Sequence, residues 1–228
     1  MIENKIGELE INKVYCGDCL EFMKQLSDNS VDLVLTDPPY GINADKGVGG
    51  FGSSPNSAKK YDDNWDSQTP TKEVFDEILR VGKKVIIFGG NFFTDKLPFK
   101  SRWIVWDKIG NMKLDCPFSE CELAWTNLDG VSIKKYLVIQ AGFIAEEKNR
   151  VHPTQKPVKL FRNIIKDNTN EGDLVLDCFI GSGTTAVACK QLGRNFIGFE
   201  ISQEYVDICN KRLSQGNIKE WFDGGLRE

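Results

Sequence analysis

The sequence lacks the features that would place it in a membrane or in the secretory pathway. Its 228 residues contain no apolar run that approaches the roughly 18 residues of a membrane-spanning helix. The first ten residues lack the charged-then-apolar pattern of a signal peptide. Internal repeats and low-complexity tracts are also missing, and the ordinary composition argues against disorder or a fibre. We therefore expect a cytoplasmic protein with no membrane partner.

An excess of positive charge is missing as well. The 33 acidic residues outnumber the 29 basic ones and give a formal net charge of −4. This balance argues against a surface coated with basic residues. It leaves room for a local basic cleft, because an acidic protein can still contact phosphate groups at one place.

The cysteines do not form a regular metal-binding pattern. The seven are Cys16, Cys19, Cys116, Cys121, Cys178, Cys189 and Cys209. The first four could be assembled into a four-sulfur zinc site. Neither of these pairs has the tight knuckle that such sites need, and most of the other cysteines lie in apolar strand or helix patterns. A free cysteine acts there as a small hydrophobe, so we predict no metal site.

One short stretch combines an apolar strand with a rigid turn. Residues 31–36 are rich in β-branched and aliphatic side chains and predict a buried strand. Pro38 and Pro39 then end the ladder of hydrogen bonds. Asp37 and Tyr40 flank the prolines at the carboxyl edge of this strand, where open α/β sheets bind ligands. On these residues alone, a purely structural turn with Asp as a cap and Tyr as a packing residue is an equal alternative.

Strands and helices alternate along the chain. We predict strands over residues 11–16, 31–36, 84–88, 102–107, 122–126, 173–178 and 195–199. We predict helices over residues 71–81, 91–97, 184–192 and 202–213, with two more beginning near residues 18 and 157. This alternation indicates an α/β fold with a doubly wound, mostly parallel sheet. The short link between the strands at 102–107 and 122–126 predicts one antiparallel strand, which we place at the edge of the sheet.

Two stretches show no clear periodicity. Residues 41–66 form a long glycine-rich segment directly after the Pro-Pro turn, which predicts a lid over a site, with a surface insertion as the alternative. Residues 128–149 have a strand-like composition in places but too few apolar residues for an independent domain. We therefore predict a single domain over residues 1–228.

A glycine turn near the end of the chain resembles a nucleotide-binding motif. Gly181-x-Gly183-x-x-Ala186 follows a predicted strand and opens a helix, and Glu200 ends the next strand. This pattern fits the dinucleotide-binding fingerprint, so a nicotinamide-dependent dehydrogenase and a nucleotide-binding module without chemistry are alternatives. Too few residues follow the turn to complete a sheet. The remaining strands must come from the N-terminal part, which places the strand of the Pro-Pro turn beside the strand of the glycine turn, with both carboxyl ends facing one crevice. A dehydrogenase, in contrast, usually begins with its glycine turn.

Three segments, in their order along the chain, resemble the β group of DNA amino-methyltransferases. They are Asp37-Pro38-Pro39-Tyr40, His152-Pro153-Thr154-Gln155-Lys156-Pro157 and Asp177-Cys178-Phe179-Ile180-Gly181-Ser182-Gly183-Thr184-Thr185. The resemblance runs from about residue 13 to residue 213. It implies a circularly permuted Rossmann-like methyltransferase fold, S-adenosylmethionine as the cofactor, and methylation of an exocyclic amine of adenine or cytosine. Cys178 departs from the proline usual in the family, and 128–149 is far shorter than a typical target-recognition region.

The resemblance also implies roles for individual residues. Asp37 would accept an N–H of the target amine, helped by the carbonyl of Pro38, whose direction is restricted by Pro39. Tyr40 would stack on a base flipped out of the duplex. The residues expected around the cofactor are Asp18, Asp37, His152, Thr154, Gln155, Lys156, Asp177, Phe179, Gly181, Ser182, Gly183, Thr184, Thr185 and Glu200. Among these, Glu200 would bind the ribose hydroxyls and Asp18 the adenine amine, while His152 has an equal alternative as a hydrogen-bonding residue before a helix.

The substrate predicted from the resemblance is adenine N6 in double-stranded DNA. Family members with Asp at the first motif position mostly act on adenine, and cytosine N4 is the alternative. The short segment 128–149 favours a short or relaxed target, or help from a second subunit in a homodimer, and a partner nuclease is compatible with this class. Candidate phosphate contacts are Lys59, Lys60, Lys108, Lys113, Lys134, Lys135, Lys148 and Arg150.

Overall fold

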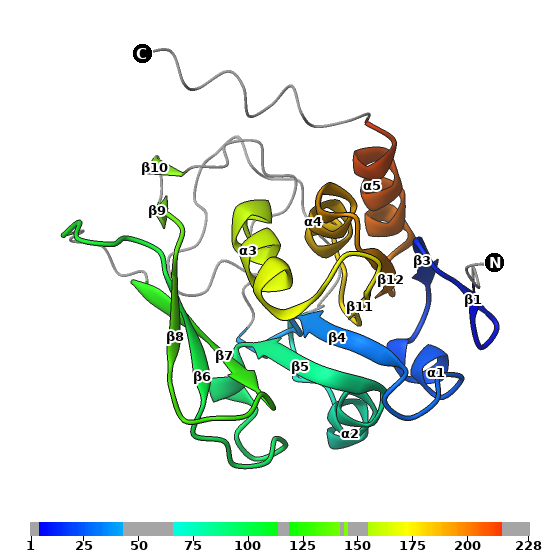
Figure 1. The fold of residues 1–228 in the computed structure, drawn as a ribbon, viewed down its shortest axis with the longest axis horizontal. Helices are drawn as coiled ribbons and strands as arrows, with labels where there is room; N and C mark the ends of the chain where they lie inside the picture. Colours follow the sequence, from blue (N-terminus) through cyan, green and yellow to red (C-terminus); the bar gives the residue numbers. More distant parts are fainter. Residues whose placement is uncertain (1–4, 43–65, 114–118, 142–143, 146–154, 216–228) are drawn as a thin grey trace.

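The computed structural model describes residues 5–42, 66–113, 119–141, 144–145 and 155–215. Most of the predicted lid, together with His152 and Thr154, lies outside these ranges. Within them, no helix is long and apolar enough to cross a membrane. The centre of the molecule is one eight-stranded sheet with helices on both faces (Figure 1).

The elements alternate between strand and helix, as predicted. The strands of the main sheet are β3 (Lys13–Cys16), β4 (Val31–Thr36), β5 (Gly82–Phe88), β6 (Trp103–Asp107), β7 (Cys121–Thr126), β8 (Lys134–Leu137), β11 (Leu174–Asp177) and β12 (Asn195–Glu200). The helices are α1 (Cys19–Met23), α2 (Lys72–Val81), α3 (Val158–Asn168), α4 (Thr184–Leu192) and α5 (Gln203–Ser214), with a short 3-10 helix η2 (Gly90–Phe92). Two small hairpins pair β1 (Lys5–Ile6) with β2 (Leu9–Glu10), and β9 (Gln140–Ala141) with β10 (Ile144–Ala145).

The sheet has the strand order β3-β12-β11-β4-β5-β7-β6-β8 and is mostly parallel. The predicted α/β class is confirmed. The position of the antiparallel strand was wrong: β7 runs against both β5 and β6 and lies between them, while the edge strand β8 is parallel to β6. The chain leaves β5, skips one position to form β6, and then turns back to fill the gap with β7. A short link correctly indicates an antiparallel pair, but it does not say which of the two strands lies farther out.

The strands from the two ends of the chain interleave. β11 and β12 lie between β3 and β4, with Leu176 opposite Val34 and Glu200 opposite Cys16. The strand that precedes the glycine turn is therefore the direct neighbour of the strand that precedes the Pro-Pro turn. Since both strands are parallel, their carboxyl ends open at the same edge of the sheet, as the sequence predicted.

Each face of the sheet is covered by its own group of helices. Figure 1 shows α3, α4 and α5 on one side and α1 and α2 on the other. Alternating residues of β4 serve the two faces: Leu33 and Leu35 pack toward α3, and Val34 packs with the α1–α2 side. All three are fully buried. Burial of each such side chain stabilises the fold by about 1.5–3 kcal/mol, so the period-two pattern fixes the sheet between two helical layers.

Local backbone geometry accounts for the elements that differ from prediction. The strand expected at 11–16 begins only at Lys13, because Asn12 has a left-handed φ of 63° and its side chain accepts a hydrogen bond from the Phe196 amide at 3.1 Å. The helix expected at 91–97 was wrong. Only η2 and a hydrogen-bonded turn after it form, because Phe93 leaves the helical region with a φ of −124° and a ψ of 21°.

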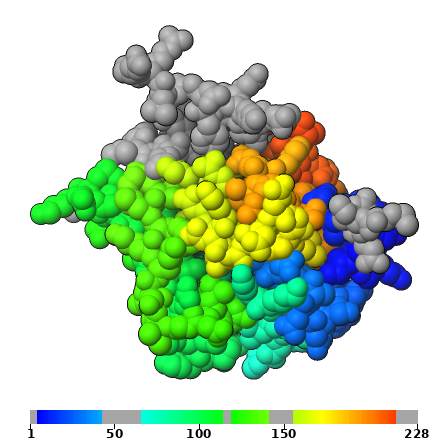
Figure 2. All heavy atoms as spheres, viewed as in Figure 1, coloured from blue at the N-terminus to red at the C-terminus, as the bar shows by residue number. Residues whose placement is uncertain are grey.

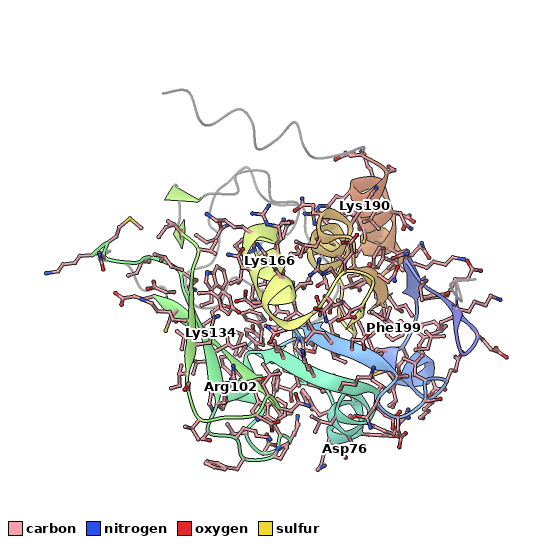
Figure 3. The ribbon with its side chains drawn as sticks, viewed as in Figure 1. Asp76, Arg102, Lys134, Lys166, Lys190 and Phe199 are labelled. Carbon is pink, nitrogen blue, oxygen red and sulfur yellow. The ribbon has the colours of Figure 1, made fainter. Side chains whose placement is uncertain are left out.

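The segment predicted for target recognition contributes directly to the sheet. Strand β8 belongs to this segment and forms one edge of the sheet. Directly after β8, the Val138 carbonyl accepts a hydrogen bond from the Trp106 indole at 2.9 Å. Figure 2 shows β8 (green), α3 (yellow) and α4 (orange) on one continuous face, where α3 contacts both β8 and α4. Figure 3 labels Lys134 on β8, whose ammonium pairs with Asp167 of α3 at 3.0 Å. Lys135 pairs with Asp107 at 3.1 Å, so both of these candidate phosphate contacts already have a carboxylate partner.

Candidate functional site

Two of the predicted motifs meet at the carboxyl end of β4. Asp37 directly follows this strand, and its Oδ2 lies 2.6 Å from Nζ of Lys156, which precedes α3. Asp37 Oδ1 accepts a hydrogen bond from the Tyr40 hydroxyl at 2.6 Å. Lys156 Nζ also donates to the Tyr40 oxygen at 3.2 Å. The site therefore joins residues that are more than a hundred positions apart through one carboxylate.

The Tyr40 ring is held in place by residues that follow β5. Phe92 stacks on it, with ring centroids 4.9 Å apart and an interplanar angle of 14°, and Phe93 packs edge-on at 6.1 Å. Gly89 lies against the ring with a φ of +68°, and a Cβ there would come within 2.1 Å of Tyr40. Sequence reasoning missed both Gly89 and Phe92. The Gly-Gly pair at the end of a predicted strand was the signal that could have indicated a close approach.

A second carboxylate and a second lysine continue the network outward. Glu122 of β7 places Oε2 3.2 Å from Lys156 Nζ and Oε1 3.2 Å from Lys108 Nζ. Lys108 directly follows β6 and is only 9% exposed. Its prediction as a surface contact to phosphate was wrong, because this lysine is buried and committed to Glu122. Glu122 itself was not predicted, since nothing local in the sequence marks a pairing across strands.

The ionisation of this network follows from burial and pairing. Burial raises the pKa of Asp37, and the Lys156 ammonium opposes that rise. Burial alone would lower the pKa of Lys156, but Asp37 and Glu122 outweigh it and hold this pKa well above its usual value. Burial works to raise the pKa of Glu122, and the two lysines together lower it. At neutral pH Lys156 is therefore charged and Glu122 is ionised.

Asp177 fixes the start of the glycine turn. Thr36 donates to its Oδ1 at 2.8 Å, the Phe179 amide donates to the same oxygen at 3.1 Å, and the Thr185 hydroxyl donates to Oδ2. Burial raises the pKa of Asp177 to about 6 despite these donors. Because all of its contacts join β4, the turn and α4, Asp177 acts in this structure as a connector between the two motifs.

Glu200 and the two glycines form the open part of the turn. Glu200, at the end of β12, accepts hydrogen bonds from the amides of Gly181 and Ser202, both at 2.9 Å. Burial raises the pKa of its carboxyl. Gly181 and Gly183 have positive φ values of 49° and 88°. A Cβ on Gly183 would lie 2.2 Å from Cys209 Sγ of α5, whereas a Cβ on Gly181 would meet nothing within 4 Å. The turn therefore packs tightly on one side and leaves free space on the other.

The remaining predicted cofactor residues connect the Lys156 segment to this turn. Ser182 donates to the Gln155 side chain at 3.2 Å, and Thr184 donates to the Lys156 carbonyl at 3.2 Å. Arg212 of α5 donates to the Ser182 carbonyl at 2.6 Å. These bonds hold the Lys156 backbone beside the glycine turn. The Lys156 side chain therefore extends toward Asp37 from a backbone whose position is fixed.

Asp18 lies on the same edge of the sheet, one strand farther along. It caps α1 by accepting from the Leu20 amide at 2.9 Å and is exposed. The preceding Gly17 amide donates to the Glu200 carbonyl at 2.8 Å, which brings the ends of β3 and β12 together. The structure thus places Asp18 on the same edge as Glu200 and the glycine turn.

The four-sulfur zinc alternative does not fit this fold. Cys16 is in β3 and Cys121 is in β7, five strand spacings apart in the sheet. At about 4.8 Å per strand this separation is roughly 24 Å, far beyond the reach of a shared tetrahedral ion. Among the described residues, Cys178, Cys189 and Cys209 are buried and free.

A permuted, mostly parallel α/β sheet whose acidic Pro-Pro turn lies beside a glycine turn defines a Rossmann-like methyltransferase. The match to the DNA methylase family N6_N4_Mtase spans residues 124–211. The Type II methyltransferase M1.MboII of Moraxella bovis is 31% identical over 265 residues, which cover 92% of this chain and 99% of that protein. The chain therefore belongs to the N6/N4 DNA methylase family. This membership removes the dehydrogenase and the non-catalytic module from consideration.

Solved structures agree with this assignment. The protein in the M1.HpyAVI–SAM complex is 26% identical to this chain. The match covers 89% of this chain and 98% of that protein, and the two structures superimpose with a TM-score of 0.56. The cytosine-N4-specific PvuII DNA methyltransferase is 20% identical, covers 91% of this chain, and superimposes with a TM-score of 0.59. At that identity the second likeness shows the fold alone.

Proposed function

We propose that this DNA methyltransferase transfers a methyl group from S-adenosylmethionine to the N6 amine of adenine in double-stranded DNA. The observation that carries the proposal is Asp37, an acceptor at the carboxyl end of β4 whose neighbouring strand leads into the glycine turn. Aspartate at this position also favours adenine over cytosine within the resemblance described above.

The free side of the glycine turn suits the cofactor. S-adenosylmethionine supplies a methyl group activated by its sulfonium charge. Open space at Gly181 admits a ligand against the backbone, and the half-buried Glu200 carboxylate suits a pair of ribose hydroxyls. Phe179 and the exposed Asp18 flank the same edge. These groups fit an adenosine-bearing cofactor, and M1.HpyAVI has been solved as a complex with SAM.

In the proposed reaction, Asp37 makes the target amine a better nucleophile. The lone pair of an adenine amine is delocalised into the ring, and an acceptor that binds one N–H favours the pyramidal, more reactive nitrogen. Each carboxylate oxygen has two lone pairs, so Asp37 can accept this bond while it keeps Tyr40 and Lys156 as partners. The fixed geometry of Pro38 and Pro39 supplies positioning, which is a large part of the rate in a direct transfer.

Tyr40 provides a surface for the flipped base. Phe92 stacks on its ring and holds the ring in a fixed orientation against which a base can stack. Stacking of this kind contributes about 1–3 kcal/mol per base and repays part of the cost of unstacking the nucleotide from the duplex. The proposal also assigns a role to two segments: residues 41–66 act as a lid, and residues 128–149 act as the target-recognition segment. A second copy of the chain and a partner nuclease are the further partners that we propose.

Analysis of the methylated nucleosides tests the proposal. The protein is incubated with methyl-labelled S-adenosylmethionine and unmethylated genomic DNA, which is then digested and separated by chromatography. We expect the label in N6-methyldeoxyadenosine. Label in N4-methyldeoxycytidine would move the activity to the other base of the same family, and the absence of label in any nucleoside would overturn the proposal.

A further inference from the structure

Lys156 creates an electrostatic conflict at the proposed reaction centre. Its ammonium lies 2.6 Å from Asp37, and only 7% of its side chain is exposed. The target amine gains positive charge as the methyl group arrives. A buried cation beside the acceptor opposes that charge, because Coulomb interactions are strong where water is excluded. If Lys156 is to hold Asp37 in place, another group must compensate the positive charge of its ammonium.

Glu122 is positioned to supply that offset. Its Oε2 lies 3.2 Å from Lys156 Nζ, so the ammonium bridges two carboxylates, Asp37 on one side and Glu122 on the other. With Asp37 ionised, as methyl transfer requires, the inner group of Asp37, Lys156 and Glu122 carries a net charge of −1. Lys108 binds the other oxygen of Glu122 at 3.2 Å and therefore anchors it from the far side.

We propose that Glu122 is a positioning residue for methyl transfer: it compensates the Lys156 ammonium, so that Lys156 orients Asp37 without opposing the charge on the target amine. Glu122 acts through Lys156 and does not contact the base. This role rests on the proposed function, because it requires Asp37 to receive the amine. The same role explains the buried Lys108, whose ion pair with Glu122 fixes the position of the Glu122 carboxylate.

The charges around Asp37 predict a signed effect on pH dependence. Lys156 lowers the pKa of Asp37, and Glu122 raises it. Tyr40 donates to the carboxylate, and Asp177 of β11 interacts with it electrostatically. Transfer requires ionised Asp37, so its rate falls below that pKa. Loss of Lys156 should move this acidic limb to higher pH, and loss of the Glu122 charge should move it to lower pH.

A double-mutant cycle of Glu122→Gln and Lys156→Met tests the role. Single-turnover methyl transfer is measured with saturating S-adenosylmethionine and unmethylated DNA. Alone, Glu122→Gln should slow transfer at least 30-fold, with cofactor Kd and DNA KM changed less than threefold. In the Lys156→Met background the same change should cost less than threefold, since no cation remains to be compensated. The acidic limbs of the two single variants should move in opposite directions.

Lys83→Gln is the matched control, because Lys83 forms a 2.7 Å ion pair with Asp32 between β5 and β4 at the opposite edge of the sheet. It should leave transfer unchanged. An equal loss from Glu122→Gln in both backgrounds would overturn the compensating role while wild-type activity keeps the proposed function intact. If the wild-type protein methylates no base, both the proposed function and the positioning role of Glu122 are wrong.

Should Glu122→Gln fail to fold, Glu122→Asp keeps the charge but shortens the side chain, and it should slow transfer three- to tenfold in the wild-type background only. Loss of folding in both variants would show that Glu122 is structural and would overturn the proposal.

Discussion

Lys156 shows how much of this site depends on a single side chain. The sequence motif placed it at the cofactor, and its backbone indeed bonds Thr184 at the glycine turn. Its ammonium instead reaches Asp37, Tyr40 and Glu122. One residue therefore links the glycine turn, where we propose that the cofactor binds, to Asp37 and Tyr40, where we propose that the base binds.

Asp37→Ala should abolish methyl transfer and leave cofactor binding nearly intact. The variant removes the acceptor of the target amine, while Glu122 still neutralises the buried Lys156. Transfer is measured with labelled cofactor, and the Kd for S-adenosylmethionine is measured by calorimetry, with a change of less than threefold expected. Asp76→Ala on the exposed face of α2 is the control for loss of a paired carboxylate. An equal collapse of cofactor binding would show that Asp37 holds the cofactor or the fold.

Asp177→Asn should change how stability depends on pH. Burial raises the pKa of Asp177 from 3.8 to about 6, so between these values the folded state binds more protons than the unfolded state. The contribution of Asp177 to stability therefore falls as pH rises through this window, by up to about 3 kcal/mol. The variant should lack that fall, as measured by urea unfolding at pH 4.5 and 6.5.

Asp32 provides a control of opposite sign for this measurement. Burial would raise its pKa, but the hydrogen bond from Lys83 and the Leu174 amide together lower it. Its contribution is therefore lost as pH falls, and Asp32→Asn should remove a slope in the other direction. If Asp177→Asn leaves the pH dependence of the free energy of unfolding unchanged, Asp177 is not protonated in the folded protein in this range.

At the scale of the elements, Gly183→Ala should disrupt the packing of the glycine turn against α5. A left-handed φ of 88° costs a residue with a Cβ about 1–2 kcal/mol, and the overlap with Cys209 adds about 1–3 kcal/mol. We expect the free energy of unfolding to fall by roughly 2–5 kcal/mol, measured in urea. In a Cys209→Ala background the overlap with the sulfur is removed, and the cost should fall to the backbone strain plus a close contact with the Cβ of residue 209 at 3.1 Å. An unchanged cost there would locate the whole effect in the backbone.

Elements with a strong local pattern were predictable from the sequence, and their neighbours in space were only partly so. The strand at 31–36 is found with the predicted bounds, because its apolar side chains fill both faces of the sheet. The adjacency of β4 and β11 followed from counting strands. The insertion of β7 between β5 and β6 has no local signature. Glu122 was missed for the same reason, since its partners come from distant segments.

At the scale of the whole molecule, the interleaved sheet predicts that neither half folds alone. A fragment of residues 1–150 would have β3 and β4 with an unfilled space between them, and a fragment of residues 151–228 would have two central strands without flanks. We expect no cooperative urea transition in either fragment by circular dichroism, and recovery of signal when they are mixed. The intact chain should unfold in one transition.

A fragment of residues 151–228 that carries Val175→Pro is the control for this complementation. Proline in the central strand β11 removes a ladder hydrogen bond, so mixing should recover no signal. A cooperative transition of the N-terminal fragment on its own would contradict the dependence of β3 and β4 on the C-terminal strands.

The same interleaving has a consequence for synthesis on the ribosome. Asp37 and Tyr40 leave the exit tunnel before Lys156, the glycine turn and the strands that separate β3 from β4 have been translated. A nascent or prematurely terminated chain therefore carries the proposed acceptor of the amine without the glycine turn that we propose binds the methyl donor. On the function proposed above, a chain that stops before the glycine turn could not transfer a methyl group.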